Sequence, residues 1–545
     1  MIMNITALDW TVLVSYLVII TAIGLVVGYR VRRSNEYFLG GRRFGPWLMV
    51  AQSFGAGTHA EMPVALAGAV YVSGASGIWF QWKNLFITPF YWIMAPVFRR
   101  IRRTTMAEFA EDRYGPWMAG IYIVFAICFF VIETSGMLKG AGKVISQATG
   151  GTVAVNAIVV AMTVMFVLYS FVGGLVSAAW TDLFQGFLII VLSFMLIPLG
   201  WRVVGGLAGM KGSLAPFRFS LSTPSGIGPW VILMLTINGL VGIMAQPHMV
   251  AAVGTGRDER TCRIGMFCGN YVKRVCTVGW MLVGLMVGAI VAQGRVDAAM
   301  LHDPENAFGV ACRQLLFPGA LGLLIASILA TNMSACSAFL VDSGALFTEG
   351  LYRRRLMPGR RDSHYLWVGR LSGLAITGIG VLYAMFLIER VLYTFLLTET
   401  LATFVGIGVL GGVVWRRANR WGAFASLMLA LTTNFTLYRV KGQRLDYWDA
   451  NVFLASLLVG ISALVLVSLL TSPEPDAALE SFFGRLETSS DDDTKRPLLL
   501  VHLLHPVRSS WRRLGRTFRE DLGGLAIGSL MVLLLVIVTA TFLAM

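Results

Sequence analysis

Apolar runs of roughly 20 residues recur along almost the whole chain, and each is long enough to cross a hydrocarbon core of roughly 30 Å. The pattern predicts about fourteen membrane-spanning helices. We expect them at residues 7–28, 46–73, 77–98, 117–140, 153–173, 182–204, 226–252, 268–294, 315–350, 366–388, 391–415, 421–438, 448–470 and 523–545.

Composition agrees with a lipid environment. Of 545 residues, 56% are hydrophobic and only 13% charged, and the mean hydropathy is +0.72. A soluble chain of this length would divide into several domains with charged surfaces. The fold class is therefore expected to be an all-α integral membrane protein.

The net charge of +15 has a defined location, because arginines gather in every second loop. By the positive-inside rule these basic loops are cytoplasmic, and an even number of spans then places both termini outside the cell membrane. Charge held at membrane ends, and not on one face, argues against nucleic-acid binding. The arginines are Arg30, Arg32, Arg33, Arg42, Arg43, Arg99, Arg100, Arg102, Arg103, Arg257, Arg260, Arg263, Arg353, Arg354, Arg355, Arg360, Arg361, Arg416, Arg417 and Arg420.

The chain carries no Walker loop, no dinucleotide fingerprint and no zinc-ligand spacing. We therefore expect no cofactor, no enzymatic activity and no energy supply from ATP. The expected partners are a small solute, a coupling ion and the lipid bilayer.

The stretch "SFGAGTHAEM" is unusual inside the second apolar run. Non-helical backbone is tolerated at membrane depth only where it lines a protein-buried or wet cavity, and there its carbonyls can coordinate a small cation. Gly55 and Gly57 supply permissive backbone, and Thr58, His59 and Glu61 supply polar groups. We expect a broken helix at this point.

A second interruption follows five spans later in "TINGLVGIMAQPHM". Here Asn238, Gly239, Gly242, Gln246 and Pro247 interrupt an apolar run. Interrupted helices at corresponding positions of two halves indicate an inverted-repeat transporter with a site at the membrane midplane.

Several longer motifs resemble those of the sodium/solute symporter family. They are "SNEYFLGGRRFGPW", the "AE" of the broken helix, "GAVYVSG", "TTMAEFAEDRYG", "VGGLVSAAWTDLFQG" and "ILATNMSACSAFLVDSGALFTEGLY", in order over roughly residues 8–470. The resemblance implies a leucine-transporter-like core of two inverted five-helix repeats with broken first helices, flanked by extra helices.

The family resemblance and the apolar runs together divide the chain into six predicted segments. They are a first helix with a basic cytoplasmic loop (1–45), a first inverted repeat (46–204), a second inverted repeat (226–415), two accessory helices (416–471), a cytoplasmic polar and amphipathic linker (472–521) and a final helix (522–545). In the linker, two helical pieces around "LLLVHLLHPV" and "SSWRRLGRTF" are expected on the inner leaflet, with Trp511 and Leu514 below the headgroups. A solvated linker is the alternative.

The resemblance also implies a sodium site between the first broken helix and the ninth span. Its ligands would be the carbonyls of Gly55, Thr58 and Thr331 and the hydroxyl of Ser334. Oxygen ligands suit a hard cation. Sodium is therefore the expected coupling ion.

One position departs from the family pattern, because Ala335 stands where relatives carry a second hydroxyl. Thr331 lies on the same helix face and is a candidate replacement. Thr331 and Ser334 can instead be packing residues. Coupling to protons through His59, Asp342 or Lys83 remains the alternative.

Asp182 in "WTDLFQG" matches an acid that the family carries at the cytoplasmic end of span six. The resemblance implies a place on the inner exit path of the ion. An N-cap of the following helix is the alternative.

The solute site is expected around His59, Met62, Gln81, Lys83, Asn84 and Asn238, with Glu133 and Glu399 nearby. Met62 stands where sugar-transporting relatives carry a sugar-binding glutamine, which argues against a sugar. Lys83, about two turns into an apolar helix, favours a solute with a carboxylate. Alternatively, Lys83 pairs with Glu61 or Glu133 and is structural.

The function predicted from the sequence is sodium-coupled uptake of a small polar organic solute by alternating access, with a carboxylate or amino acid favoured over a sugar. The alternatives are a proton-coupled or cation-independent transporter of the same fold, or a membrane sensor built on it.

Overall fold

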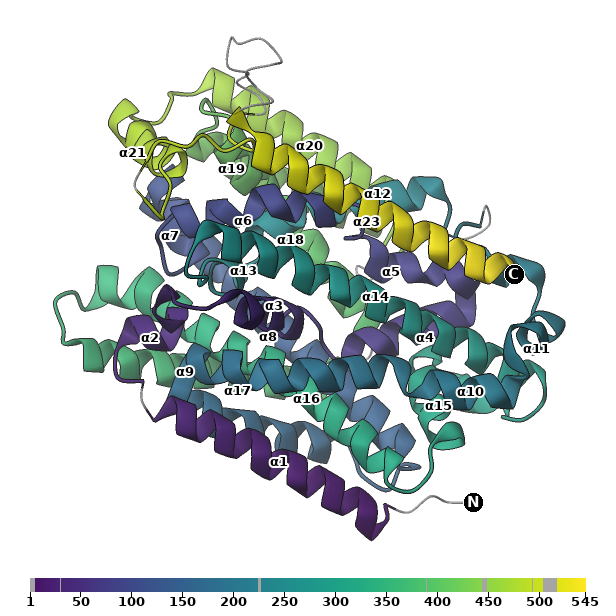
Figure 1. Cartoon of the computed structure of the whole chain (residues 1–545). Helices are drawn as coiled ribbons and strands as arrows, with labels where there is room; N and C mark the ends of the chain where they lie inside the picture. The colour runs from purple at the N-terminus through teal and green to yellow at the C-terminus, as the bar shows by residue number, and fades with distance from the viewer. Residues whose placement is uncertain are drawn as a thin grey trace.

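A computed structural model describes residues 5–29, 31–223, 227–388, 390–443, 448–492, 494–502 and 517–545, apart from the side chain of Tyr393. Within these ranges the chain is helical and contains no β-strand. The long helices run roughly parallel across one bundle (Figure 1).

Ten helical segments of the described residues are long and apolar enough to cross a membrane. The predicted all-α membrane fold is confirmed, whereas the count of fourteen spans stays a prediction. The helices longer than 20 residues are α1 (Ala7–Gly28), α8 (Pro116–Ala148), α9 (Val155–Phe194), α14 (Glu259–Ala292), α16 (Ala320–Phe347), α17 (Asp362–Phe386), α18 (Val391–Val414), α19 (Arg420–Val440), α20 (Ala450–Leu470) and α23 (Arg519–Ala544). Of these, α19 is not among the ten apolar segments, which include instead the run of short helices over Glu61–Trp82.

Shorter helices arise where the chain breaks or turns at a membrane surface. They are α2 (Ser34–Leu39), α3 (Pro46–Gly55), α4 (Glu61–Ser73), α5 (Trp79–Trp82), α6 (Tyr91–Arg100), α7 (Met106–Tyr114), α10 (Leu196–Val204), α11 (Gly206–Ser213), α12 (Pro229–Gly242), α13 (Met249–Val253), α15 (Ala307–Leu315) and α21 (Asp476–Glu487), with 3₁₀ turns η2 (Gly74–Ile78), η3 (Thr88–Phe90) and η5 (Ile243–Ala245) and a π-helical turn η8 (Thr348–Leu356).

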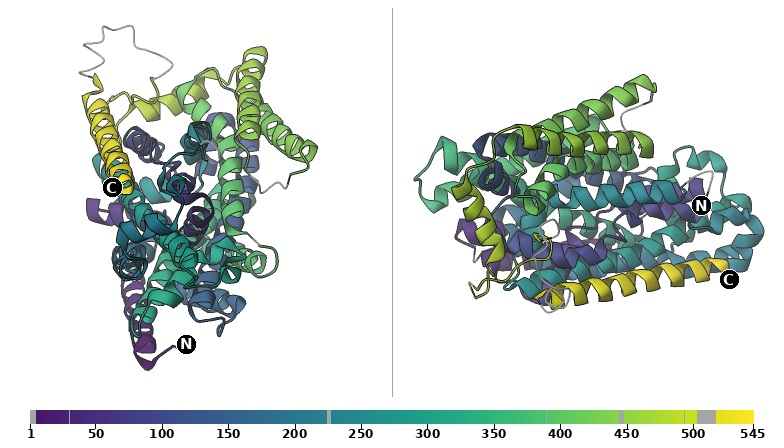
Figure 2. Two further views of the ribbon diagram at one scale, coloured as in Figure 1. Left: turned by 90° about the vertical axis from the view of Figure 1, so that its right-hand side faces the viewer. Right: turned by 90° about the horizontal axis from the view of Figure 1, so that it is seen from above.

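The centre of the bundle is α16, which is buried over its whole apolar window and packs against α9, α17, α8 and α1. The outermost helices α1 and α23 are mostly exposed, with 22% and 17% of their windows buried. Seen along the bundle, α1, α23 and the α19–α20 pair occupy separate edges (Figure 2). These helices present apolar side chains outward, as lipid contact requires.

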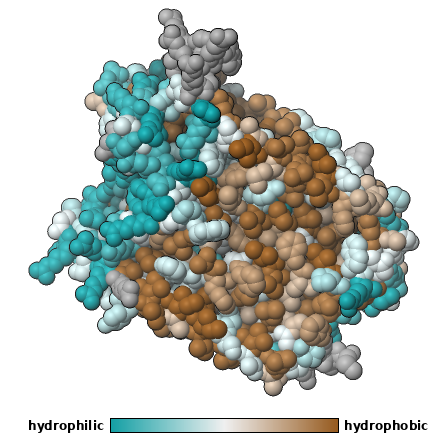
Figure 3. Space-filling model, in the orientation of Figure 1, coloured by the Kyte–Doolittle hydropathy of each residue, from teal (hydrophilic) through white to brown (hydrophobic). Residues whose placement is uncertain are grey.

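The surface is divided as a membrane protein requires. A broad apolar belt covers the helix sides, and hydrophilic residues gather at one end, where α2, α7 and α21 lie (Figures 1 and 3). Helix α1 begins and α23 ends at the opposite end (Figure 1). The arginine-rich loops and the chain ends therefore lie on opposite sides of the apolar belt.

One predicted span differs from the structure. Span three does not form one helix: after α5, hydrogen bonds from the Leu85 amide to the Trp82 carbonyl (2.7 Å) and from the Thr88 amide to the Leu85 carbonyl (3.1 Å) wind the chain more tightly before α6. Lys83 consequently caps α5 and does not lie within a regular helix. The cause is local, because Pro89 cannot donate an amide to a continuous helix.

Spans five and six are the two arms of α9, and the chain turns back sharply between them at Gly174. The arms lie side by side, because the Tyr169 hydroxyl donates to the Met333 carbonyl and Gln185 Nε2 donates to the Tyr16 hydroxyl, which itself contacts Met333 Sδ. Gly174 has φ +56°, and a Cβ there would lie 2.5 Å from the Tyr37 carbonyl oxygen. Only glycine fits such a conformation and approach. Asp182 therefore lies inside α9, and its predicted role as an N-cap is wrong.

The segment after α20 folds back over the hydrophilic end. The Arg100 guanidinium pairs with both carboxylate oxygens of Glu259 (2.9 and 2.8 Å) and donates to the carbonyls of Leu486 and Arg496. Helix α21 of this segment was not predicted. Most of the two predicted amphipathic pieces, with Trp511 and Leu514, lies outside the described residues, as does Arg30.

We predict that the hydrophilic end faces the cytoplasm, since it carries the arginines. Arg360 is exposed at that end and Ala298 is exposed beyond the far end of α14. In intact cells, an impermeant thiol reagent should label an Ala298→Cys variant and not an Arg360→Cys variant. The unsubstituted protein is the background control, because Cys128 is exposed on the belt. Labelling of Arg360→Cys from outside would reverse the orientation.

Candidate functional site

The first broken helix is interrupted between α3 and α4, at residues 56–60, as the glycines predict. Its freed backbone groups are bonded by side chains. The Lys273 ammonium donates to the Gly57 carbonyl, and the Ala60 amide donates to Asn332 Oδ1 at 3.0 Å. His59 Nε2 lies 3.0 Å from the Ala56 carbonyl. The break is thus held by α14 and α16.

The second break lies at residues 246–248, between η5 and α13. Pro247 offers no amide there. The Ala245 carbonyl accepts from Tyr122 Oη at 2.6 Å, and Gln246 Nε2 donates to Glu399 Oε1 at 3.0 Å. Both interruptions predicted from the sequence are therefore present.

The two broken helices are bonded to each other. Gln52 Nε2 on α3 donates to the Ala251 carbonyl (3.1 Å), and Ser53 Oγ donates to the Ala252 carbonyl (3.2 Å) on α13. All four residues are buried. The breaks consequently share one rigid connection.

Beside the first break, three of the residues singled out for the ion meet. Ser334 Oγ on α16 donates to Asp182 Oδ1 on α9 at 2.5 Å. A Cβ at position 55 would lie 2.6 Å from Ser334 Oγ and 3.2 Å from Asp182 Cγ, so only glycine allows this approach. The Thr58 hydroxyl and Asp182 Oδ2 are buried with no hydrogen-bond partner within the described residues.

The other two candidate ion ligands, Thr331 and Ala335, offer no side-chain oxygen without a hydrogen-bond partner. The Thr331 hydroxyl donates to the Ser327 carbonyl of its own helix at 2.7 Å. Ala335 is fully buried and has no polar side chain. The oxygen-rich point is therefore formed by α3, α9 and α16 through Gly55, Asp182 and Ser334.

A cavity of about 60 Å³ lies between the two breaks, lined also by residues of α5, α8, α14, α16 and α18. Of the predicted solute residues, His59, Met62, Gln81 and Asn84 line it. Asn84 packs directly against Gly239, and a side chain at position 239 would collide with it: a Cβ there would lie 2.0 Å from Asn84 Oδ1.

Two predicted solute residues do not line this cavity. Asn238 is turned to α18, where its Oδ1 accepts from the Thr403 hydroxyl. Lys83 is 1% exposed and pairs with Glu399 Oε2 at 3.0 Å. Its Nζ also lies 4.5 Å from the centre of the Phe395 ring. The alternative prediction that Lys83 pairs with Glu61 or Glu133 is therefore wrong.

Sequence reasoning missed Lys273 and His248, which both line the cavity. A signal for Lys273 was present, because "GNYVKRVCTVGW" places Lys273 and Arg274 together inside an apolar run. Ionisable residues inside a membrane segment are functional by default. Arg274 is 1% exposed, does not line the cavity, and donates to the Gln81 carbonyl at 3.0 Å.

A membrane-embedded bundle with two interrupted helices around a central polar cavity is the architecture of a secondary transporter and not of an enzyme. The profile of the "Sodium:solute symporter family" matches residues 37–430. The chain belongs to the sodium:solute symporter family.

Similar proteins agree with this assignment. The osmoregulated proline transporter OpuE of Bacillus subtilis (strain 168) is 26% identical over 87% of this chain and 96% of its own length. The high-affinity proline transporter PutP of the same organism is 27% identical over 86% of this chain and 100% of its own length. The sodium/proline symporter of Haemophilus influenzae is 25% identical over 83% of this chain and 93% of its own length.

A solved structure shares the fold. A Na⁺-coupled sialic acid symporter in a substrate-bound, outward-open state superposes with a TM-score of 0.73 at 17% identity, covering 86% of this chain and 99% of that one. The sequence expectation of a symporter fold is confirmed.

The Lys83–Glu399 pair gives a stability prediction. Lys83→Met should lower the free energy of unfolding by about 3–5 kcal/mol, because it leaves a buried carboxylate without its cation. The double variant Lys83→Met/Glu399→Gln should recover most of the loss. Melting temperatures of the purified variants check this. A single variant as stable as the parent protein would mean that the pair contributes nothing.

Proposed function

We propose that the protein couples inward sodium movement to uptake of a small solute that carries a carboxylate, with an amino acid favoured over a sugar. Family membership supports sodium as the coupling ion, and three relatives carry proline in their names. The observation that carries the proposal is the meeting of Gly55, Asp182 and Ser334 beside the first break.

These groups form a suitable sodium site. The Gly55 carbonyl stands at the end of α3 and accepts one hydrogen bond, from the Thr58 amide at 3.2 Å, so its second lone pair is available to a cation. The Ser334 hydroxyl, the free Asp182 oxygen and the Thr58 hydroxyl add oxygen donors. Asp182 replaces the hydroxyl that Ala335 lacks and supplies a negative charge. Asp182 is therefore a ligand of the sodium ion, or a residue that the ion contacts as it leaves the site toward the cytoplasm.

The cavity supports a small carboxylate-bearing solute. Its volume of about 60 Å³ lies far below the roughly 300–1,000 Å³ of sites for drug-sized ligands. Lys83 pairs with Glu399 and does not line the cavity. Lys273 is the cation that both lines the cavity and contacts the broken helix, so we assign the carboxylate to Lys273.

The remaining expectations extend this proposal. We place the protein in the plasma membrane with both termini outside, because the arginine-rich end lies opposite the chain ends. The segment around α21 then lies in the cytoplasm. Residues 46–204 and 226–415 form the two repeats, each opening with one of the breaks.

Sodium should stabilise the purified protein against heat, because a bound ligand selects the folded state; at 100 times its dissociation constant the gain is about 2.7 kcal/mol. Ser334→Ala and Asp182→Asn should each abolish this shift, and Ala335→Ser should enlarge it. Potassium is the control ion. Equal shifts with sodium and potassium would make proton coupling the better explanation.

Lys273→Met should weaken solute binding, because one charge-assisted hydrogen bond worth about 1.5–3 kcal/mol is lost. This loss corresponds to a roughly ten- to hundredfold lower affinity. Uptake of radiolabelled proline into proteoliposomes, driven by a sodium gradient, measures this, with glucose as the comparator solute.

Arg274→Met is the matched control, since Arg274 is the adjacent buried cation outside the cavity wall. It should leave the affinity within about twofold, and a change below about 0.4 kcal/mol is the size expected for a group that makes no contact with the solute. Equal losses in the two variants, or uptake of glucose in place of any amino acid, would contradict the assignment.

A further inference from the structure

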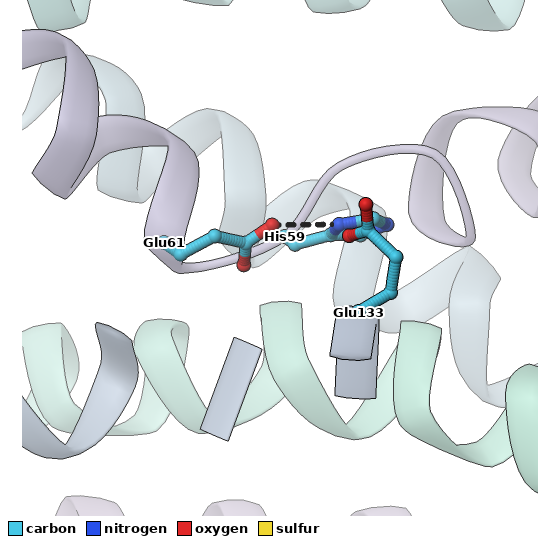
Figure 4. Close-up of side chains that lie close together, drawn as sticks. All are labelled: His59, Glu61 and Glu133. Atoms are coloured by element: carbon cyan, nitrogen blue, oxygen red, sulfur yellow. Dashed lines mark hydrogen bonds and ion pairs between the residues drawn. The ribbon is translucent and has the colours of Figure 1, made fainter. Parts of the chain in front are cut away.

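Three buried side chains in and beside the cavity wall form a cluster that includes none of the proposed sodium ligands and not Lys273, the proposed partner of the solute carboxylate. They are His59 from the first break, Glu61 at the start of α4 and Glu133 of α8 (Figure 4). One ligand atom from each lies within 4.8 Å of the other two. Their exposed fractions are 6%, 2% and 5%.

The hydrogen bonds of His59 fix where its hydrogens lie. Nε2 faces the Ala56 carbonyl at 3.0 Å, and a carbonyl can only accept, so Nε2 carries a hydrogen. Nδ1 then faces Glu61 Oε1 at 2.8 Å. A lone pair and an ionised carboxylate repel each other at this distance, so a hydrogen lies between the two atoms. A metal ion that binds both atoms must displace that proton.

Two further oxygens are available to that cation. Glu61 Oε2 and Glu133 Oε1 are buried and have no hydrogen-bond partner among the described residues. Figure 4 shows the Glu133 carboxyl reaching the imidazole of His59 from its own helix. A carboxylate taken out of water without a partner is costly, so an arrangement of this kind favours a ligand of positive charge.

We propose that His59, Glu61 and Glu133 bind a divalent transition-metal ion of the zinc type in the wall of the cavity. One imidazole nitrogen and two carboxylates are a donor set that zinc uses in open sites, which keep a further position for water or substrate. Magnesium and calcium prefer oxygen ligands only. On binding, zinc displaces the proton shared by His59 and Glu61, and that proton leaves to solvent.

The geometry needs little adjustment. Zinc holds nitrogen and oxygen ligands at roughly 2.0–2.2 Å, so ligand atoms must approach within about 4 Å of one another. A spacing of up to 4.8 Å closes through rotation of the unpaired Glu133 side chain. The bond from His59 Nε2 to the Ala56 carbonyl already orients the ring, as such bonds do for metal-ligating histidines.

The cluster is distinct from the sodium site, which uses Gly55, Asp182 and Ser334. His59 and Glu133 line the cavity, so a bound zinc ion occupies the space of the solute. Zinc should therefore inhibit uptake, an effect that rests on the proposed function. The binding itself does not rest on it and is measured without sodium or solute.

The test is titration of the purified full-length protein with zinc chloride in a calorimeter, with cobalt chloride as a spectroscopic probe of the ligand set. We expect one zinc per chain at this cluster and a visible cobalt spectrum for nitrogen and oxygen ligands. Glu133→Gln and His59→Gln should each lower the affinity for zinc by about a hundredfold or more. Replacing a residue that only orients a metal ligand typically lowers it by 10–100-fold. Magnesium should give no heat.

Matched controls separate this cluster from other histidines and acids. His248→Gln replaces the second buried histidine of the same cavity, and Lys83→Met/Glu399→Gln removes a cavity carboxylate outside the cluster together with its paired lysine; both should keep zinc affinity. Each variant must show one cooperative melting transition close to that of the parent protein, which reports folding without sodium or solute. If either Glu133→Gln or His59→Gln fails to fold, the zinc affinity of the other variant tests the proposal.

The proposal is overturned if the parent protein binds no zinc, or if Glu133→Gln and His59→Gln bind it as tightly as His248→Gln does. A shared proton alone would then account for the His59–Glu61 contact. Zinc binding without inhibition of uptake would leave the site intact and count against the proposed solute cavity.

Discussion

The whole centre of this protein depends on one constraint: a bilayer interior offers no water to unpaired backbone groups. A buried polar group without a partner costs about 2–7 kcal/mol. Two helices are nevertheless broken at membrane depth. They persist because Lys273, Asn332, Tyr122 and Gln246 bring side-chain partners to the breaks or to the groups beside them. The positions of α14, α16 and α18 follow from this need.

The same constraint governs the charges around the cavity. Three buried acidic side chains, Glu61, Glu133 and Glu399, are accompanied by three buried basic side chains, Lys83, Lys273 and Arg274. Lys83 and Glu399 neutralise each other directly, and Arg274 is held by the Gln81 carbonyl. Lys273 and Glu133 are left facing the cavity, where one favours an anionic group and the other a cationic one.

Most of the fold could be predicted from the sequence, because apolar length, arginine-rich loops and paired glycines act through local rules. The break at Gly55 and Gly57 is an example, since its signal lies within ten residues. Partners across the bundle are different. Lys83 and Glu399 are far apart in sequence, and nothing local distinguishes Glu399 from Glu61 or Glu133.

The shape of the turn at Gly174 and the helix α21 could not be predicted for related reasons. The adjacent glycines of "FVGGLV" indicate a turn, but its tightness depends on the close approach of Tyr37. Helix α21 has weak apolar patterning of its own. It is held by Arg100 and by Phe109, whose ring packs against Phe482, so tertiary contacts and not propensity define it.

The bonds from Gln52 and Ser53 to the Ala251 and Ala252 carbonyls have a kinetic consequence. Under the proposed function they couple the tilting of the two interrupted helices, because tilting one alone costs the two bonds, about 0.5–1.5 kcal/mol each. The proposed ion site and the proposed solute site are then favoured to open together to the same side of the membrane. Leakage of ions down their gradient without cargo is disfavoured to that extent.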